Sequence, residues 1–231
     1  MKTIASICAR GGSVGVPRKN IKMLHGLPLI AHTILQAKAC GQIDEVYVST
    51  DDAEIAEVAR SYGAQVPFLR PAHLATSAAG KVPVIAHLAD WVEQNVGPFD
   101  RLVDLDPTSP LRLGSDIDSC LDLLDADTDV VITAFESEKN PYFNMVSHQA
   151  DGNIGLVCGS PDGIVARQQA PAVYSMNASI YVWHRHTICK GLWKGRVRLH
   201  VMPRERSVDI DSPLDFKIVD MLMHERKEGV Q

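Results

Sequence analysis

The sequence has no excess of basic residues and no long run of apolar residues. Its 231 residues include 23 Lys and Arg against 28 Asp and Glu, a formal net charge of −5, whereas general binding to nucleic acid or anionic membranes depends on the opposite balance. The first apolar run meets Arg10 too early for a signal peptide, and no later stretch has transmembrane length. We therefore expect a cytoplasmic protein that binds neither nucleic acid nor membranes.

Several familiar metal, redox and nucleotide motifs are also absent. The five cysteines form no C-x-x-C pair and the nine histidines form no H-x-x-x-H pair, which favours free thiols in a reducing compartment over a thiol or histidine metal site. Neither G-x-G-x-x-G nor a P-loop occurs, and the chain contains no repeats or low-complexity tracts.

A glycine-rich, cationic loop is the most distinctive feature present. It reads Ala9-Arg10-Gly11-Gly12-Ser13-Val14-Gly15-Val16-Pro17-Arg18-Lys19-Asn20 and follows an apolar run that we expect to form a buried strand. The glycines allow a tight turn and bring backbone N–H groups close to a ligand, while Arg10, Arg18 and Lys19 add positive charge. This combination favours binding of a phosphorylated ligand over a solvated surface turn.

Helix and strand patterns alternate through most of the chain. They predict helices over 28–40, 52–62, 82–94, 116–124 and 214–228, and strands over 3–8, 43–50, 65–68, 101–106, 129–134, 176–183 and 196–202. This order predicts one α/β domain over 1–231, with a mostly parallel sheet between helices. Residues 136–178 break the pattern, which indicates an irregular insertion or β-arm, with a flexible surface loop as the alternative.

Two pairs of aspartates add a second candidate feature, Asp104 with Asp106 and Asp209 with Asp211. Because side chains alternate along a strand, the members of each pair share a face, and the first pair ends a strand where open α/β sheets bind ligands. Mg2+ prefers carboxylate oxygens and takes its remaining ligands from phosphates and water. Together with the basic loop, the pairs favour metal-assisted phosphoryl or nucleotidyl transfer over helix caps or isolated surface acids.

A series of short motifs follows the loop in a fixed order: Val48-Ser49-Thr50-Asp51, Arg70-Pro71, Pro107-Thr108-Ser109-Pro110-Leu111-Arg112, Arg167-Gln168-Gln169, Asn177 with Ile180-Tyr181, and Asp209-Ile210-Asp211. With the loop, they resemble the acylneuraminate cytidylyltransferases, or CMP-sialic acid synthetases, over nearly the whole chain. The resemblance implies a Rossmann-like three-layer nucleotidyltransferase fold. It also implies that the anomeric hydroxyl of a nonulosonic acid attacks the α-phosphate of CTP, with Mg2+ as cofactor. The products would be pyrophosphate and a CMP-sugar for surface polysaccharides.

The resemblance also assigns roles to individual residues. Nucleotide binding would fall to Ala9, Arg10, Gly11, Gly12, Ser13, Lys19, Asn20 and Arg70, with Lys19 also catalytic. Asp209 and Asp211 would bind the metal and help to activate the sugar hydroxyl. The sugar would be held by Asp106, Thr108, Ser109, Arg167, Gln168, Tyr174 and Asn177, with Arg167 on its carboxylate. Residues 136–178 would form a dimerisation arm that reaches the partner's site, which implies a homodimer.

The chain departs from the family pattern at a few positions. Val14 replaces a loop lysine, Asp106 replaces a common glutamine, and Ser175 stands where some members carry a second arginine. These changes bear on the identity of the sugar substrate more than on the class of reaction. A 3-deoxy-manno-octulosonate cytidylyltransferase is one alternative, which the Pro-Arg-Lys-Asn end of the loop disfavours. A nucleotide- or sugar-sensing module without turnover is another, and the retained Asp209 and Asp211 argue against it.

Overall fold

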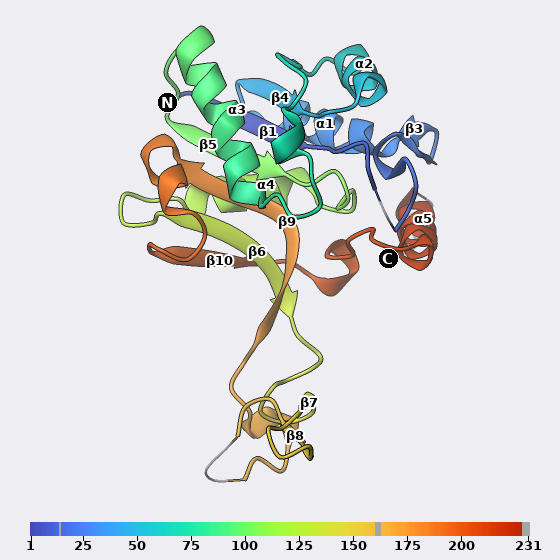
Figure 1. Ribbon diagram of the computed structural model, residues 1–231, viewed down its shortest axis with the longest axis vertical. Coiled ribbons are helices and arrows are strands. Elements are labelled where there is room, and N and C mark those ends of the chain that lie inside the picture. The colour runs from blue at the N-terminus through green and yellow to red at the C-terminus, as the bar shows by residue number, and fades with distance from the viewer. Residues whose placement is uncertain (14, 160–162, 228–231) are drawn as a thin grey trace.

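A six-stranded sheet forms the centre of the body in the computed structural model, which describes residues 1–13, 15–159 and 163–227 (Figure 1). Its order is β10-β6-β9-β5-β1-β4. The strands are β1 (Thr3–Cys8), β4 (Glu45–Ser49), β5 (Arg101–Leu105), β6 (Val130–Glu136), β9 (Tyr174–His184) and β10 (Val197–Val201). Only β9 runs against its neighbours among these six. The mostly parallel α/β sheet that the sequence predicted is confirmed.

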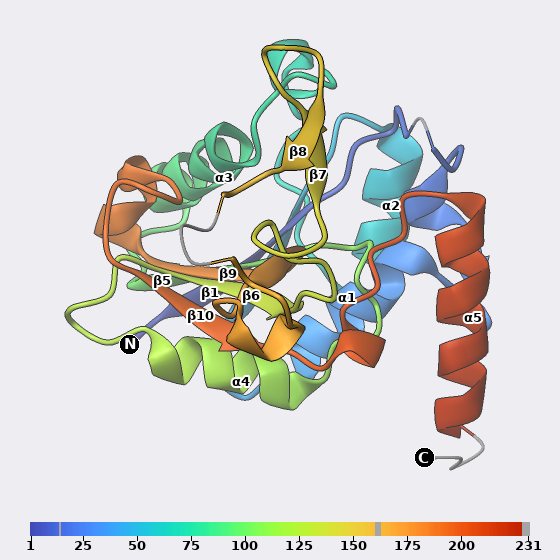
Figure 2. The same cartoon turned by 90° about the horizontal axis from the view of Figure 1, so that it is seen from below.

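Helices cover both faces of this sheet, so that the body has three layers (Figure 2). On one face lie α1 (Leu29–Ala39), α2 (Ala53–Ser61) and α4 (Gly114–Leu123), and on the other lies α3 (Lys81–Asn95). Alternation along β1 serves both layers, because Ile4 packs with the α3 cluster while Ala5 and Ile7 pack with the opposite one. The cores are therefore two apolar clusters separated by the sheet.

Local sequence signals explain where several elements begin and end. The Asp52 carboxylate accepts hydrogen bonds from the backbone N–H groups of Glu54 and Ile55 at 2.8 and 3.1 Å, which starts α2. The strand predicted over 65–68 is wrong, since only isolated bridges form, at Gln65 and at Leu69. Pro67 lies between them and has no N–H group to extend a ladder.

The segment after β6 leaves the body as a long projection and returns along β9 (Figure 1). It contains a short antiparallel hairpin of β7 (Val146–His148) and β8 (Ile154–Leu156) and the 3-10 helix η3 (Arg167–Gln169). This segment therefore folds as a β-arm, and we refer to residues 136–178 as the arm.

The C-terminal helix α5 (Pro213–Lys227) packs beside the glycine-rich loop. Val219 of α5, Ile210 and Val16 of the loop share one apolar cluster, which holds the segment before α5 against the loop. The remaining short elements are β2 (Met23–Leu24), β3 (Leu27–Pro28), η1 (Lys19–Ile21), η2 (Ala72–Leu74), η4 (Arg185–Lys190) and η5 (Arg204–Arg206). Among the residues that the structure describes, no helix combines the length and apolarity needed to cross a membrane.

Candidate active site

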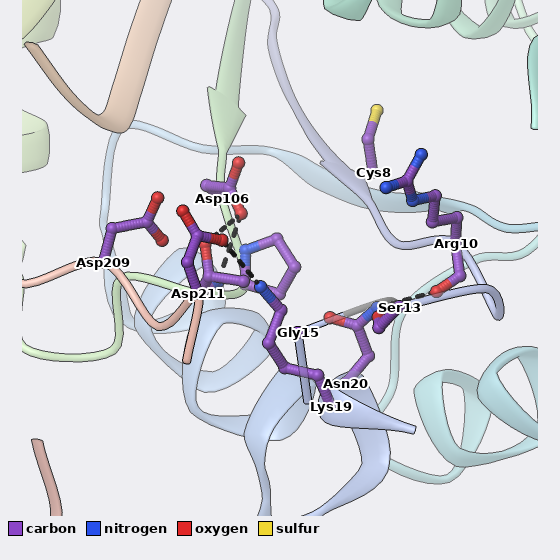
Figure 3. A pocket seen from close by; sticks show the side chains of 11 residues that line it. Cys8, Arg10, Ser13, Gly15, Lys19, Asn20, Asp106, Asp209 and Asp211 are labelled. Atoms are coloured by element: carbon purple, nitrogen blue, oxygen red, sulfur yellow. Dashed lines mark hydrogen bonds and ion pairs between the residues drawn. The ribbon is translucent and has the colours of Figure 1, made fainter. Parts of the chain in front are cut away.

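A cavity of about 390 Å3 opens beyond the C-terminal ends of β1 and β5. Three segments far apart in the sequence line it: Cys8 with loop residues Arg10, Ser13, Gly15, Lys19 and Asn20; Asp106, Pro107 and Thr108 after β5; and Asp209 and Asp211 before α5 (Figure 3). The structure thus brings the cationic loop and the second aspartate pair, which the sequence singled out separately, to one site.

Glycines let the loop lie close to its neighbours. A Cβ atom on Gly15 would lie 1.9 Å from the carbonyl oxygen of Asp211, and one on Gly11 would lie 2.7 Å from Oδ2 of Asp52. Asn20 fixes the turn from inside, because its Nδ2 donates a hydrogen bond to the Arg10 carbonyl at 3.0 Å. The loop geometry therefore depends on glycine at both positions. Val14, the departure from the family pattern, lies outside the described residues.

Lys19 connects the loop to the aspartate segment. Its Nζ donates to the carbonyl of Ile210 and, at 3.2 Å, to Oδ1 of Asp211. Its side chain is only 13% exposed, whereas that of Asp211 is 79% exposed. An ammonium group held at the cavity wall in this way can form charge-assisted hydrogen bonds to phosphate oxygens.

Asp209 is the more enclosed of the two aspartates. Burial and, to a smaller extent, the negative charge of Asp106 raise its pKa, a hydrogen bond from Thr108 opposes both effects, and the resulting pKa is about 6. Its Oδ1 atom is buried and has no hydrogen-bond partner among the described residues. A carboxylate oxygen left unpaired beside a cavity is suited to binding a cation.

The pair Asp209 and Asp211 fits a magnesium site that substrate completes. In the described part of the chain, no group of three or more His, Cys, Asp or Glu side chains is arranged to hold a metal ion. Mg2+ commonly uses only one or two carboxylates, however, and takes its other ligands from water and substrate phosphates. Two carboxylates beside a glycine-rich, cationic loop in one cavity are a donor set that suits that arrangement.

The structure corrects the interpretation of Asp104. This residue was expected to form a metal-binding pair with Asp106, but its side chain is buried and does not line the cavity. Its Oδ1 accepts a hydrogen bond from Ser6 at 2.5 Å, and its Oδ2 pairs with Lys81 at 3.2 Å. Asp104 therefore contributes to the scaffold, whereas Asp106 faces the cavity.

Lys81 is the residue that sequence reasoning missed. Its Nζ lies 2.8 Å from Oδ2 of Asp106, and Oδ1 of Asp106 accepts hydrogen bonds from the N–H and hydroxyl groups of Thr108 at 3.1 and 2.8 Å. Burial would raise the pKa of Asp106, but Lys81 and Thr108 lower it to about 2. The acid in place of a family glutamine was a usable signal, because such a charge near a buried strand end requires a nearby cation.

Arg112 holds the turn that carries Asp106 and Thr108. Its buried guanidinium donates to the carbonyl of Ser109 at 2.9 Å, to that of Ser179 at 3.0 Å, and to that of Asp106. Burial lowers its pKa to about 10, although nearby aspartates oppose the shift. These three hydrogen bonds to backbone oxygens hold the turn in place against β9.

Other predicted site residues do not line the cavity, and all of those named here except Gly12 are buried. Arg70 donates to Oγ of Ser49 at 3.0 Å and to the Ser49 carbonyl. The amide of Asn177 accepts from Thr133 at 2.7 Å and donates to Ser207 at 3.0 Å. Ala9, Gly12 and Ser109 also lie outside the lining. The ligand-binding roles of these residues stay predictions.

The predicted sugar-binding residues of the arm lie apart from the cavity of their own chain (Figure 1). Arg167 and Gln168 belong to η3, where Arg167 donates to the Glu138 carbonyl at 2.7 Å. Tyr174 and Ser175 pair with β6 at the start of β9. A single chain therefore does not join these residues to the cavity, and their predicted role requires a second subunit.

Comparison with known proteins identifies the family. A family model described as cytidylyltransferase matches residues 4–101. A post-translational flagellin modification protein B of Campylobacter coli is 39% identical over 227 residues, which cover 96% of this chain and 95% of that protein. A CMP-N,N'-diacetyllegionaminic acid synthase of Campylobacter jejuni is 40% identical over 224 residues, which cover 95% and 94%.

A solved structure extends the likeness to the fold. The CMP:2-keto-3-deoxy-manno-octonic acid synthetase complexed with CTP matches with a TM-score of 0.72 at 16% identity, over 98% of this chain and 100% of that one. At this identity the match shows a shared fold alone. With relatives near 40% identity over almost its full length, the chain belongs to the acylneuraminate cytidylyltransferase (CMP-sialic acid synthetase) family of CTP-dependent nucleotidyltransferases.

Proposed function

We propose that the protein transfers the cytidylyl group of CTP to a sialic-acid-like nonulosonic acid, giving a CMP-sugar and pyrophosphate. The observation that carries this proposal is that the cationic loop and the pair Asp209 and Asp211 line one cavity. Nucleotidyl transfer requires donors for the leaving pyrophosphate on one side and charge stabilisation at the attacked phosphorus on the other. The cavity holds both.

Four of the lining residues then have a chemical task. Arg10 and Lys19 bind the triphosphate oxygens and stabilise the charge that builds up on the leaving pyrophosphate. Asp209 and Asp211 hold Mg2+, which when bound neutralises the α-phosphate and lowers the pKa of an oxygen beside it. Through the metal that they would hold, Asp209 and Asp211 would also help to activate the sugar hydroxyl.

The relatives direct the choice of sugar. The Campylobacter jejuni relative is named for N,N'-diacetyllegionaminic acid, and its level of identity makes a diacetamido nonulosonic acid the first substrate to test. The octulosonate enzyme remains the second candidate, supported here only by a shared fold.

The arm supports the further proposal that the enzyme is a homodimer. Eight large apolar side chains that the structure describes as exposed lie in the arm: Met145, Val146, Ile154, Leu156, Val157, Val165, Tyr174 and Met176. A second copy would cover this surface and could bring Arg167 and Gln168 to its partner's cavity. All five thiols are free, which is in keeping with a cytoplasmic enzyme.

The test is a pyrophosphate-release assay with each of the four ribonucleoside triphosphates and a panel of acids. The panel contains diacetyllegionaminic, N-acetylneuraminic and 3-deoxy-manno-octulosonic acids, each with Mg2+ and with excess EDTA. Release with CTP and a nonulosonic acid, abolished by EDTA, is the expected result. Release only with the octulosonic acid would favour the second candidate, and CTP binding without release from any acid would favour a sensor.

A further inference from the structure

Lys81 occupies a position that helix stability does not explain. It is the first residue of α3, and the helix begins at Gly80 without a side-chain cap. A positive charge at a helix N-terminus opposes the helix dipole. The side chain is also 27% exposed and therefore largely withdrawn from water, which adds a desolvation cost unless anions lie beside the ammonium group. The location of Lys81 must therefore be accounted for by the carboxylates beside it.

One of those carboxylates, Asp104, lies in a row of three residues across the sheet. Ser6 on β1 lies opposite Asp104 on β5, which in turn lies opposite Tyr181 on β9. Nζ of Lys81 lies 3.2 Å from Oδ2 of Asp104 and 4.9 Å from the centre of the Tyr181 ring. The lysine is thus held above the strands by an anion and an aromatic face.

Asp106 extends this cluster to the cavity. Its Oδ2 is 2.8 Å from Lys81, and its side chain is 18% exposed whereas that of Asp104 is 1% exposed. Three donors, one from Lys81 and two from Thr108, fix the carboxylate orientation. A carboxylate has about four acceptor positions, so one remains for a ligand at the wall of the cavity that Asp106 lines.

The charge of Asp106 presents a problem for an anionic substrate. An unpaired carboxylate on the cavity wall would repel the triphosphate of CTP and the carboxylate of a nonulosonic acid. Lys81, which also pairs with Asp104, offsets part of that charge without occupying the cavity, because it does not belong to the lining. The pair can therefore present an oriented acceptor while limiting the repulsion of an anion.

We propose that Lys81 is a positioning residue for substrate binding: it orients Asp106 as a hydrogen-bond acceptor for a ligand hydroxyl group and offsets its charge so that anionic substrates can enter. This inference rests on the proposed function for the identity of the anions. The hydroxyl belongs to the ribose of CTP or to the nonulosonic acid, and the experiment below separates these sources.

The charge test uses three variants in one background. Lys81→Met alone would leave Asp104 buried without a counterion, so each variant also carries Asp104→Asn. The first has Asp104→Asn only and keeps the Lys81–Asp106 pair. The second adds Lys81→Met, and the third adds both Lys81→Met and Asp106→Asn. Thermal unfolding verifies that each is folded, and calorimetry measures CTP binding with Mg2+ from 50 to 500 mM NaCl.

The expected order of CTP affinity identifies the electrostatic role. The first variant binds CTP no more than threefold more weakly than the wild type. The second binds at least about tenfold more weakly at 50 mM NaCl, and the deficit shrinks as salt rises. The third recovers to within about threefold of the first. Equal affinity in the first and second variants would overturn the proposal, as would a third variant no better than the second.

The acceptor test compares the wild type with Asp106→Ala. If Asp106 binds the ribose, 2'-deoxy-CTP or 3'-deoxy-CTP loses at least about fivefold in affinity against CTP in the wild type but not in the variant. If it binds the sugar, the KM of the acid at saturating CTP rises in the variant instead. No change in either measurement would overturn the acceptor role. A wild type that fails to prefer CTP over other triphosphates would contradict the proposed function itself, before any variant is compared.

Discussion

The cavity and the arm are built from opposite kinds of surface. The cavity is lined mainly by charged and polar side chains that other residues of the body hold in place. Lys19, for example, donates a hydrogen bond to the carbonyl of Ile210, and Asp106 forms an ion pair with Lys81. The arm presents exposed apolar side chains on the β7–β8 hairpin, in the segments beside it, and at the start of β9. The cavity therefore gathers charged groups that suit a charged ligand, whereas the arm has an exposed apolar surface.

This difference indicates how the predicted functional residues divide. Residues on the body can bind CTP within one chain, because loop and aspartates meet there. Arg167 and Gln168 lie on the arm, away from the cavity of their own chain, and in the proposed dimer they would contribute to the partner's cavity. We therefore expect changes in the cavity to affect chemistry directly and changes in the arm to act through sugar binding and assembly.

The largest effect is expected from Asp211→Ala. Loss of one metal-binding carboxylate should lower kcat by about 100-fold or more, as for removal of a group that stabilises transition-state charge. The fold should be unaffected, because the side chain is 79% exposed. Steady-state pyrophosphate release against Mg2+ concentration is the measurement. Asp127→Ala is the matched control, since Asp127 is equally exposed but lies away from the cavity; similar kinetics in the two variants would contradict the metal assignment.

A smaller and more selective effect is expected from Arg167→Ala. A guanidinium pairs with a carboxylate through charge-assisted hydrogen bonds worth about 1.5–3 kcal/mol, so the KM of the nonulosonic acid should rise by about tenfold or more. The KM of CTP should change little, because Arg167 lies on the arm. Lys139→Ala removes another exposed arm cation and serves as the control. Equal increases in both KM values for Arg167→Ala would rule out a role specific to the sugar.

The body was largely predictable from sequence, since its signals are local. Period-two strands, an Asp52 cap and glycine-terminated helices recur where expected, and the loop was recognised from glycines and charges within twelve residues. The ion pair between Lys19 and Asp211 could not be predicted from the spacing of residues in the sequence, because it depends on how α5 packs against the loop. Lys81 was missed for a similar reason, because its partners Asp104 and Asp106 lie on β5 and directly after it, across the α3–sheet interface.

The apolar surface of the arm leads to the third prediction. Ile154→Asp places a charge on an exposed apolar side chain of β8, so it should convert a dimer to monomers with little loss of body stability. Light scattering after size-exclusion chromatography would measure the mass, and thermal unfolding the stability. Turnover should fall several-fold through loss of the partner's arm. Gln149→Asp, in the exposed turn between β7 and β8, is a polar control. An unchanged dimer would place the interface elsewhere.

The smallest effect on turnover is expected from Asp116→Asn. Asp116 lies in the body but belongs neither to the cavity lining nor to the arm, so this variant tests the stability of the body alone. Asp116 is buried and accepts hydrogen bonds from Arg206 at 2.8 Å and from the Leu113 N–H at 2.8 Å. Burial raises its pKa, but these donors and His200 outweigh burial and lower it. Breaking this buried pair should cost about 3 kcal/mol of unfolding free energy at pH 7.

The pH dependence of that cost follows from the direction of the shift. A carboxyl group whose pKa is lower in the folded state stabilises the fold fully above its unfolded pKa of about 3.9 and loses that contribution as pH falls through the folded value. The difference between wild type and Asp116→Asn in urea unfolding should therefore be constant from pH 7 to 5 and shrink between pH 4 and 3. A difference that stays constant down to pH 3 would show that packing of the side chain, and not its charge, stabilises this part of the body.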